Sequence, residues 1–337
     1  MRFSSRIFCS FLLTACVGAC SSSNGQGGDG GSAGSGGGGG GGAGGGSGGG
    51  GGGIGGGGDM ALQPGTTMMR LVASNYTIPA GKEFYQCQHI TVPNDLYIIS
   101  ITPVSPVGVH HEVVAIDPTP PADGVSTCQA IGTNWTPLFA SGVGSPSLTM
   151  PDKVALKVAA GQHVVLNLHL FNATQQPLPT TGTSTAAVDV VVANDPTGYQ
   201  LAGVPFVGNV SFTVPASGLV NGQCTMSNDT NYFAVFPHMH TTGQHLKVWT
   251  ETAANGTTVV WDDDFLFNEQ KFGQYPNWKG PQQVSLKKGD KIAVTCTYGA
   301  AGVGKKFGDS TTDEMCFGIS YVYPAITTTF GTPFCVM

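Results

Sequence analysis

From about residue 60 to the C-terminus, the chain is a series of short apolar runs separated by turn-forming residues. The runs are rich in Val, Ile, Leu, Phe and Tyr, the residues between them are Pro, Gly, Asn and Asp, and no long stretch repeats with a helical period. This pattern is typical of β-sandwiches. The runs that we expect to form strands are residues 96–101, 111–116, 164–171, 187–192, 233–236, 246–249, 291–298 and 317–322. The sequence therefore predicts an all-β fold.

A weak internal repeat indicates two domains of the same kind. The string Tyr-Thr-Ile-Pro-Ala ahead of Cys87 returns as Phe-Thr-Val-Pro-Ala ahead of Cys224. A second pair of similar segments has Thr297 at the position that corresponds to His169. We place the boundary where turn formers cluster, which gives an N-terminal domain at residues 61–198 and a C-terminal domain at residues 199–337.

The N-terminus is typical of an export signal. Arg2 and Arg6 precede an apolar run at residues 7–13, which is too short to span a bilayer, and small residues follow it. Lipobox-like strings end at Cys16 and at Cys20, so residues 1–20 predict a lipoprotein signal that is cleaved before one of these cysteines, which is then lipidated. An ordinary secretory signal is the alternative. We expect an exported protein that is lipid-anchored in a bacterial cell envelope, at the outer membrane or cell surface.

The remaining composition limits the possible partners. Residues 21–60 form a linker in which almost every residue from 25 to 58 is glycine or serine, so we expect a disordered tether with a reach of roughly 30 Å. The net charge is −6, only 10% of residues are charged, and the chain has no basic block. We therefore expect no binding to nucleic acid, and membrane association only through the lipid anchor.

Cysteine usage agrees with export. Six cysteines remain outside the signal, and an even number in an exported chain is typical of disulfides. They are Cys87, Cys128, Cys224, Cys296, Cys316 and Cys335. No pair has the CxxC spacing of a zinc knuckle. Six cysteines allow fifteen pairings, so spacing alone leaves the connectivity open.

Two histidines separated by one residue form the clearest candidate metal site. His238 and His240 lie in an extended segment, where side chains alternate, so both rings point to the same side. A polar surface pair is the alternative interpretation. Met315 offers a thioether sulfur next to Cys316, which should face the opposite side, although a lone methionine usually packs in a core. Imidazole together with a soft sulfur ligand favours copper, especially Cu(I).

Three more histidines lie in similar segments. His169 shares a strand face with Asn167, where it could also be simply solvated. The neighbours His110 and His111 can share one metal only if the backbone bends, which Pro106 and Gly108 make feasible; otherwise one ring points inward and the other outward. The remaining histidines, His89, His163 and His245, receive no role.

Taken in order, these motifs resemble the copper type II ascorbate-dependent monooxygenases, the family of peptidylglycine α-hydroxylating monooxygenase and dopamine β-monooxygenase. The resemblance covers residues 65–337 and includes the histidine motifs, the glycine at 243, the Thr-Cys-Thr-Tyr string at 295–298 and the Asp-Glu-Met-Cys string at 313–316. It implies two tandem jelly-roll domains, each holding one copper, that face each other across a solvent-filled cleft. It further implies disulfides between Cys87 and Cys128, Cys224 and Cys335, and Cys296 and Cys316.

The resemblance also implies a ligand set and a reaction. His110, His111 and His169 would hold an electron-transfer copper, and His238, His240 and Met315 would form the catalytic, oxygen-binding copper site. The expected reaction is hydroxylation of an activated C–H bond of a small organic substrate with O₂ and a reductant such as ascorbate.

Two positions depart from the peptide-hydroxylating members of the family. Those members hold the substrate carboxylate with an arginine and a tyrosine at the positions of Phe236 and Ile319. A glycine-extended peptide is therefore disfavoured, and an apolar or aromatic compound is favoured. The alternatives are an envelope copper-binding lipoprotein that buffers or delivers copper without oxygenase activity, and a tethered adhesion or carbohydrate-binding sandwich in which the histidines are incidental.

Overall fold

The computed structural model describes residues 63–129, 132, 134–267, 269–308, 310–326 and 334–336. These residues belong to one compact unit, Asp59–Met337. The expected signal, the tether and the candidate lipidation sites Cys16 and Cys20 lie outside the described residues. Within the described part of the chain, no helix is both long and apolar enough to cross a membrane.

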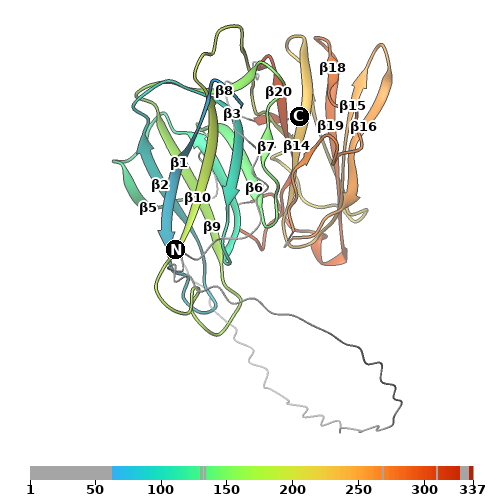
Figure 1. Ribbon diagram of the computed structural model, residues 1–337. Helices are drawn as coiled ribbons and strands as arrows, with labels where there is room; N and C mark the ends of the chain where they lie inside the picture. Colours follow the sequence, from blue (N-terminus) through green and yellow to red (C-terminus); the bar gives the residue numbers. More distant parts are fainter. Residues whose placement is uncertain are drawn as a thin grey trace, which may run out of the picture. The chain divides into compact units, whose positions relative to one another are not determined.

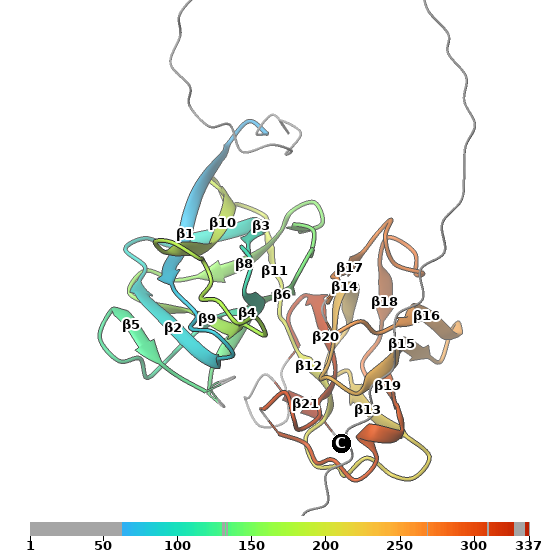
Figure 2. The same cartoon turned by 90° about the horizontal axis from the view of Figure 1, so that it is seen from below.

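The described residues form an all-β structure with four sheets (Figures 1 and 2), and all eight expected runs are strands. In the N-terminal part, one sheet has the order β1 (Thr66–Tyr76), β10 (Ser184–Ala193), β3 (Leu96–Val104), β8 (Val154–Val158) and β11 (Gln200–Leu201), with β7 (Leu148–Thr149) beside β3. The other sheet has the order β5 (Gly124–Thr127), β2 (Glu83–Thr91), β9 (His163–Phe171), β4 (Val109–Ile116) and β6 (Thr136–Gly142).

The C-terminal part repeats the plan of two sheets. One has the order β17 (Gly273–Gln274), β14 (Thr230–Met239), β20 (Cys316–Tyr323), β12 (Phe206–Asn209) and β21 (Phe334–Val336), with β18 (Val284–Leu286) beside β14. The other has the order β13 (Leu219–Thr225), β19 (Lys291–Tyr298), β15 (Gly243–Thr252) and β16 (Gly256–Asp264). A single 3₁₀ turn at Ala300–Gly302 completes the described elements.

The echo between His169 and Thr297 corresponds to equivalent strands. His169 lies on β9 between β2 and β4, and Thr297 lies on β19 between β13 and β15. The flanking strands β2 and β13 carry Cys87 and Cys224, the cysteines of the first echo. The short strand β11 still pairs with β8 of the N-terminal part, so the sheets change a few residues after the expected boundary at 198.

Three disulfides are present with the pairing that the resemblance implied. Cys87 bonds to Cys128, Cys224 to Cys335, and Cys296 to Cys316. The last of these joins β19 to the first residue of β20, directly after Met315. It therefore fixes the strand end that carries Met315 against the neighbouring sheet.

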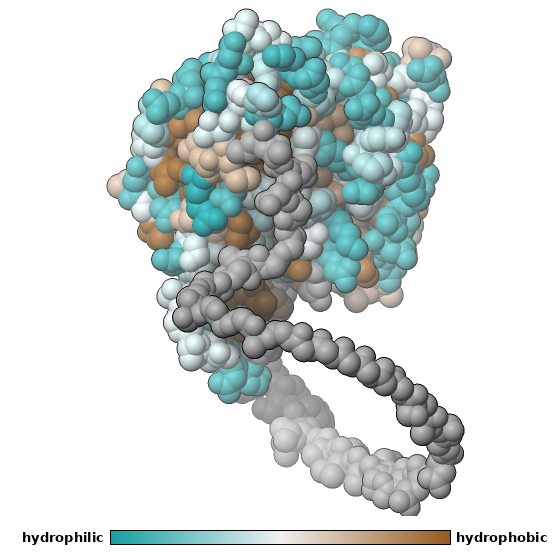
Figure 3. Space-filling view, viewed as in Figure 1, coloured by the Kyte–Doolittle hydropathy of each residue, from teal (hydrophilic) through white to brown (hydrophobic). Residues whose placement is uncertain are grey.

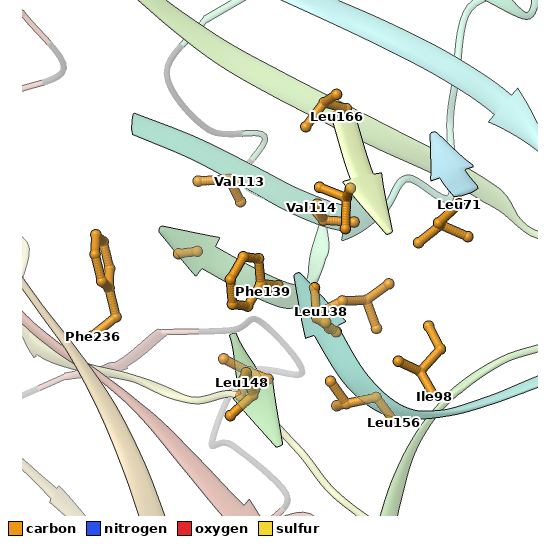
Figure 4. Packing of buried hydrophobic residues seen from close by; sticks show 14 of the residues in the cluster. Leu71, Ile98, Val113, Val114, Leu138, Phe139, Leu148, Leu156, Leu166 and Phe236 are labelled. Atoms are coloured by element: carbon orange, nitrogen blue, oxygen red, sulfur yellow. The ribbon is translucent and has the colours of Figure 1, made fainter. Parts of the chain in front are cut away.

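The resemblance implied a solvent-filled cleft between the two parts. Instead, the described residues of the two parts pack against each other. One apolar cluster contains Val113 and Phe139 from the N-terminal part and Phe236 from the C-terminal part (Figure 4). Phe317 of the C-terminal part belongs to the same cluster. The backbone N–H of Ala140 also donates to the Tyr321 hydroxyl. The physical reason is that these positions hold valine and phenylalanine, whose burial is favourable at roughly 25 cal/mol per Å² of apolar surface.

The outer surface is less apolar than this shared interior. On the face shown in Figure 3, brown side chains lie in small groups between teal and white ones. Scattered exposed apolar side chains are normal on soluble domains, so this face gives no sign of a docking patch.

Candidate metal centre

Three histidine rings of the N-terminal part converge on one point. The β4 ladder shifts register between Val109 and His111, and Gly108 before it has a φ of +99°. This irregularity turns both rings of the doublet to the same side, as the bend predicted from sequence requires. His111 Nδ1 lies 3.1 Å from His110 Nδ1 and 3.3 Å from His169 Nδ1. All three rings are buried, which excludes a solvated His169 and a doublet with one ring pointing outward.

The outer nitrogens of two of these rings have acceptors. His110 Nε2 donates to the Phe267 carbonyl at 2.8 Å, and His169 Nε2 donates to Glu83 Oε1 at 2.8 Å. Tyr85 stacks on His169 with ring centroids 4.5 Å apart. A carbonyl can only accept, so the hydrogen of His110 lies on Nε2 and its Nδ1 carries a lone pair; the same reasoning assigns His169.

This donor set fits a metal cation. The lone pairs on Nδ1 of His110 and of His169 both face Nδ1 of His111. One hydrogen on His111 Nδ1 satisfies at most one of them, whereas a cation would accept all three lone pairs. Metal-binding histidines typically donate their other N–H to a carboxylate or a carbonyl, which is the pattern at Glu83 and Phe267.

The candidate ligands of the C-terminal part come from two neighbouring antiparallel strands. His238 lies on β14 and His240 directly follows it, while Met239 between them packs in a different core cluster. β14 pairs with β20 so that His238 opposes Phe317 and Met239 opposes Cys316. One further step of this register brings His240 opposite Met315. Met315 and Cys316 belong to different core clusters, as the alternation predicts.

Hydrogen bonds orient the two rings of this group. His238 Nδ1 donates to Gln270 Oε1 at 2.8 Å, which leaves the lone pair on Nε2. The His240 ring bonds to the backbone carbonyl of Asp313, and its buried Nδ1 has no hydrogen-bond partner. An orphaned ring nitrogen, a second lone pair and a thioether around one cavity fit a soft metal such as Cu(I).

A buried carboxylate holds the His240 turn against the Met315 segment. Glu314 accepts the backbone N–H of His240 at 3.3 Å and that of Thr242 at 3.0 Å, together with the Thr242 hydroxyl. Because Glu314 is adjacent to Met315 in the chain, these bonds fix the distance between two candidate ligands.

The two groups of candidate ligands lie next to each other. The rings of His111 and His238 have centroids 5.2 Å apart, and the rings of His110 and Phe267 have centroids 3.9 Å apart. Glu83, which holds His169, also accepts the Thr311 hydroxyl at 3.0 Å. The described residues therefore form one continuous polar centre with two groups of donors.

Burial keeps these imidazoles neutral. It lowers the pKa of His110 to about 3, that of His238 to about 4 and that of His240 to about 3. It also lowers the pKa of His111 and of His169, although the hydrogen bond to Glu83 opposes the effect at His169. Neutral imidazole is the form that binds a metal, so the rings need lose no proton at neutral pH.

A small apolar cavity of about 40 Å³ adjoins both groups. Such a volume admits a few water-sized atoms. None of the side chains that line it belongs to Asp, Glu, Lys or Arg. The lining consists of Tyr85, His111, Val113, Ala140, Phe206, Phe236, His238, His240, Phe307, Met315, Phe317 and Ile319.

Residues 203–334 match the family model described as copper type II ascorbate-dependent monooxygenase, C-terminal domain. This part of the chain is similar to the C-terminal domain of that family. The match contains the His238, His240 and Met315 motifs of the copper monooxygenase resemblance, together with Gln270 and Glu314.

Comparisons with solved structures add little. A Parabacteroides distasonis protein described as secreted is 7% identical, with 79% of this chain and 85% of that chain covered, at a TM-score of 0.17. A Bacteroides ovatus protein described as an alpha-L-fucosidase is 12% identical, with 73% of this chain and 38% of that chain covered, at a TM-score of 0.16. Scores this low carry no argument about the copper monooxygenase fold or function.

Sequence reasoning missed the residues that hold the ligands. Glu83, Tyr85 and Cys87 alternate on β2, and Tyr85 pairs with His169, so a period-two pattern ahead of Cys87 was a usable signal. Phe267 and Gln270 lie in an irregular segment, where no periodic pattern could have identified them.

The three unassigned histidines lie elsewhere. His89 is buried 3.4 Å from Asp117, His163 contacts Thr91, and His245 bonds to two aspartates of β16. Within the described part of the chain, none of them belongs to the three-histidine cluster or lines the cavity.

Proposed function

We propose that this chain is a copper-dependent monooxygenase that hydroxylates an activated C–H bond of a small organic substrate, using O₂ and a reductant such as ascorbate. The observation that carries the proposal is the arrangement of two adjacent donor groups, three imidazoles and two imidazoles with a thioether, beside one apolar cavity. The family match over residues 203–334 supports the same reaction class. Two tandem jelly-roll domains, at residues 61–198 and 199–337, are part of the proposal.

The donors divide into two proposed copper sites. His110, His111 and His169 would hold one copper, and His238, His240 and Met315 would hold the other. When bound, copper would supply one-electron chemistry and the activation of O₂. The soft sulfur of Met315 favours Cu(I) at the second site, whereas three imidazoles suit either oxidation state.

The surrounding side chains would prepare the site for this chemistry. Glu83 and Gln270 fix ring tautomers, so that lone pairs face inward without competing hydrogens. The apolar lining would exclude water from the site, which limits side reactions. Burial keeps the histidines unprotonated and ready to bind metal.

The cavity lining supports an uncharged, apolar or aromatic substrate. Phe236 and Ile319 both line the cavity, beside Phe317 and Val113. A carboxylate placed there would be desolvated without a cationic partner among the lining residues, which costs several kcal/mol. This supports a hydrocarbon-like group next to His238, His240 and Met315 and argues against a glycine-extended peptide.

Replacing Met315 with isoleucine tests the proposal. We expect the wild-type protein to bind about two coppers per chain and the Met315→Ile variant to bind about one, with turnover lost. Met239→Ile is the matched control, because Met239 is also buried in the same strand pair but packs in the other core cluster. Unchanged hydroxylation by Met315→Ile would contradict the ligand assignment.

A copper-buffering or copper-delivering envelope lipoprotein is the second candidate. The small cavity volume favours it, because little room is left for a substrate. Copper binding without substrate-dependent ascorbate consumption, across a broad panel of uncharged aromatic compounds, would support this function instead.

Export and anchoring belong to both candidates. We propose that the mature chain begins at Cys16 or Cys20 and is acylated there. Intact-mass measurement of protein purified from membranes should show the acyl chains, and their absence would favour an ordinary secretory signal.

A further inference from the structure

Gln270 is a buried amide that lies between the two histidine groups. Its side-chain oxygen accepts from His238 Nδ1 at 2.8 Å. Its side-chain nitrogen donates at 3.4 Å to the Phe267 carbonyl, which also accepts from His110 Nε2 at 2.8 Å. The residue is 2% exposed, so no bulk water competes for these bonds. His110 and His238 are thus joined through one side chain and one carbonyl.

Only an amide side chain can make both of these hydrogen bonds. Its oxygen must face an N–H of His238, and its NH₂ must face a carbonyl, so the orientation of the amide is determined by its partners. Aliphatic side chains offer neither group, and a carboxylate would place an acceptor against the Phe267 carbonyl. The tautomer of His238 follows, because an oxygen acceptor at Nδ1 requires the hydrogen there and leaves the lone pair on Nε2.

The backbone of Gln270 is held by the N-terminal part of the chain. Its carbonyl accepts the Ser145 hydroxyl at 2.8 Å, and Ser145 Oγ in turn accepts the Gly142 N–H at 3.1 Å. A Cβ added at Gly142 would lie 2.5 Å from the Gln270 Cβ, which shows how closely the two segments pack. Gln270 therefore orients His238 of the C-terminal part, while contacts with the N-terminal part fix the position of Gln270 itself.

The geometry points to Gln270 as a positioning residue that holds His238 in the Nδ1–H tautomer and thereby sets the metal affinity of the His238, His240 and Met315 group. The inference rests on the proposed function in one respect, that the metal is copper. Residues that orient metal-binding histidines typically change affinity by about 10- to 100-fold when replaced. We expect a loss of this size at this group in Gln270→Met, a variant that retains volume but removes both hydrogen bonds.

The first measurement needs no metal. Nitrogen-15 NMR of histidine-labelled, metal-free protein reports which ring nitrogen of His238 carries the hydrogen, with the signal assigned by its loss in His238→Gln. We expect Nδ1–H in the wild type and in Gln270→Glu, which keeps the acceptor, and a shift toward Nε2–H in Gln270→Met. A wild-type His238 in the Nε2–H tautomer, or an unchanged tautomer in Gln270→Met, would overturn the inference.

The second measurement is Cu(I) affinity by competition with a colorimetric chelator. Gln274→Met is the matched control, because Gln274 also bridges the two parts, accepting the Thr149 N–H at 3.1 Å. Among the described residues, Gln274 has no hydrogen bond to a histidine. We expect the control to keep wild-type affinity. An equal loss in Gln274→Met would mean that general docking, not Gln270, sets the affinity. Failure of the wild type to bind copper would count against the proposed function, whereas the tautomer shift in Gln270→Met would still support the positioning of His238 by Gln270.

Discussion

The buried histidines should make the metal-free protein lose stability in mild acid. Between about pH 7.5 and about pH 5.5, histidines of the unfolded chain become protonated, since their usual pKa is 6.5. In the folded chain, burial holds the pKa of His110, His238 and His240 at about 3, about 4 and about 3. Each folded pKa is below the unfolded value, so the stabilisation is complete above pH 6.5 and is lost as the pH falls toward the folded pKa.

Linkage gives the magnitude of this effect. Each of the three rings reduces the free energy of unfolding by about 1.4 kcal/mol over this interval, which amounts to about 4 kcal/mol in total. Glu112 acts in the opposite direction, because burial raises its pKa from 4.5 to about 7, although the hydrogen bond from Ser141 lowers it. The contribution of Glu112 is greatest below pH 4.5 and is lost as the pH rises through 7, so acidification regains about 2 kcal/mol. The net loss from these four groups is about 2 kcal/mol.

Single variants separate the histidine effect from the rest. We would measure the free energy of unfolding by urea denaturation at both pH values for the metal-free wild type and for His240→Gln. The variant should lose about 1.4 kcal/mol less on acidification than the wild type. Saturating Cu(I) should raise the free energy of unfolding of the wild type at both pH values, because the folded rings are unprotonated at both and metal bound to the folded state stabilises it.

His245→Gln is the control for this measurement. Burial lowers the pKa of His245, but its hydrogen bonds with Asp262 and Asp264 raise it, with a net rise. Removing this ring should therefore leave the acid loss at least as large as in the wild type. An identical acid loss in His240→Gln and the wild type would refute the view that His240 is held neutral in the folded protein.

Two further predictions concern the carboxylate beside His169 and the disulfides. Glu83→Gln should weaken copper binding by the three-histidine group about 10- to 100-fold, as measured by chelator competition in the Met315→Ile background. The control Glu269→Gln, which changes an exposed residue, should have no effect. Equal copper affinities in the two variants would contradict the role of Glu83. Replacing Cys224 and Cys335 with alanine should cost about 5 kcal/mol of unfolding free energy, and replacing Cys296 and Cys316 about 3 kcal/mol, because the closed loops span 111 and 20 residues. Urea denaturation of the two double variants checks the order, and a reversed order would show that native-state contacts dominate over loop entropy.

The periodic part of the centre could be predicted from sequence. Alternation alone placed His238 and His240 on one side of the extended segment at the end of β14 with Met239 on the other, and it separated Met315 from Cys316. The bend at the His110–His111 doublet was signalled by Gly108, whose φ of +99° is readily adopted only by glycine. These features depend on local backbone geometry, which short-range sequence determines.

The residues that hydrogen-bond to the histidines could not be predicted, because their positions depend on how the two parts pack. Phe267 and Gln270 lie in an irregular segment, and their contacts with His110 and Gly142 cross more than a hundred residues of sequence. The resemblance implied separated coppers, yet His111 and His238 have ring centroids only 5.2 Å apart.

Two residues of the cavity lining, Phe236 and Ile319, also belong to the apolar cluster that the two parts share. Phe236 and Ile319 are at positions where peptide-hydroxylating relatives hold a carboxylate, and both are buried in the cluster shared by the two parts. A polar pair at these positions would keep water between the two parts, whereas apolar side chains gain free energy by excluding it. We therefore expect a variant that restores a carboxylate anchor at these positions to separate the two histidine groups as well.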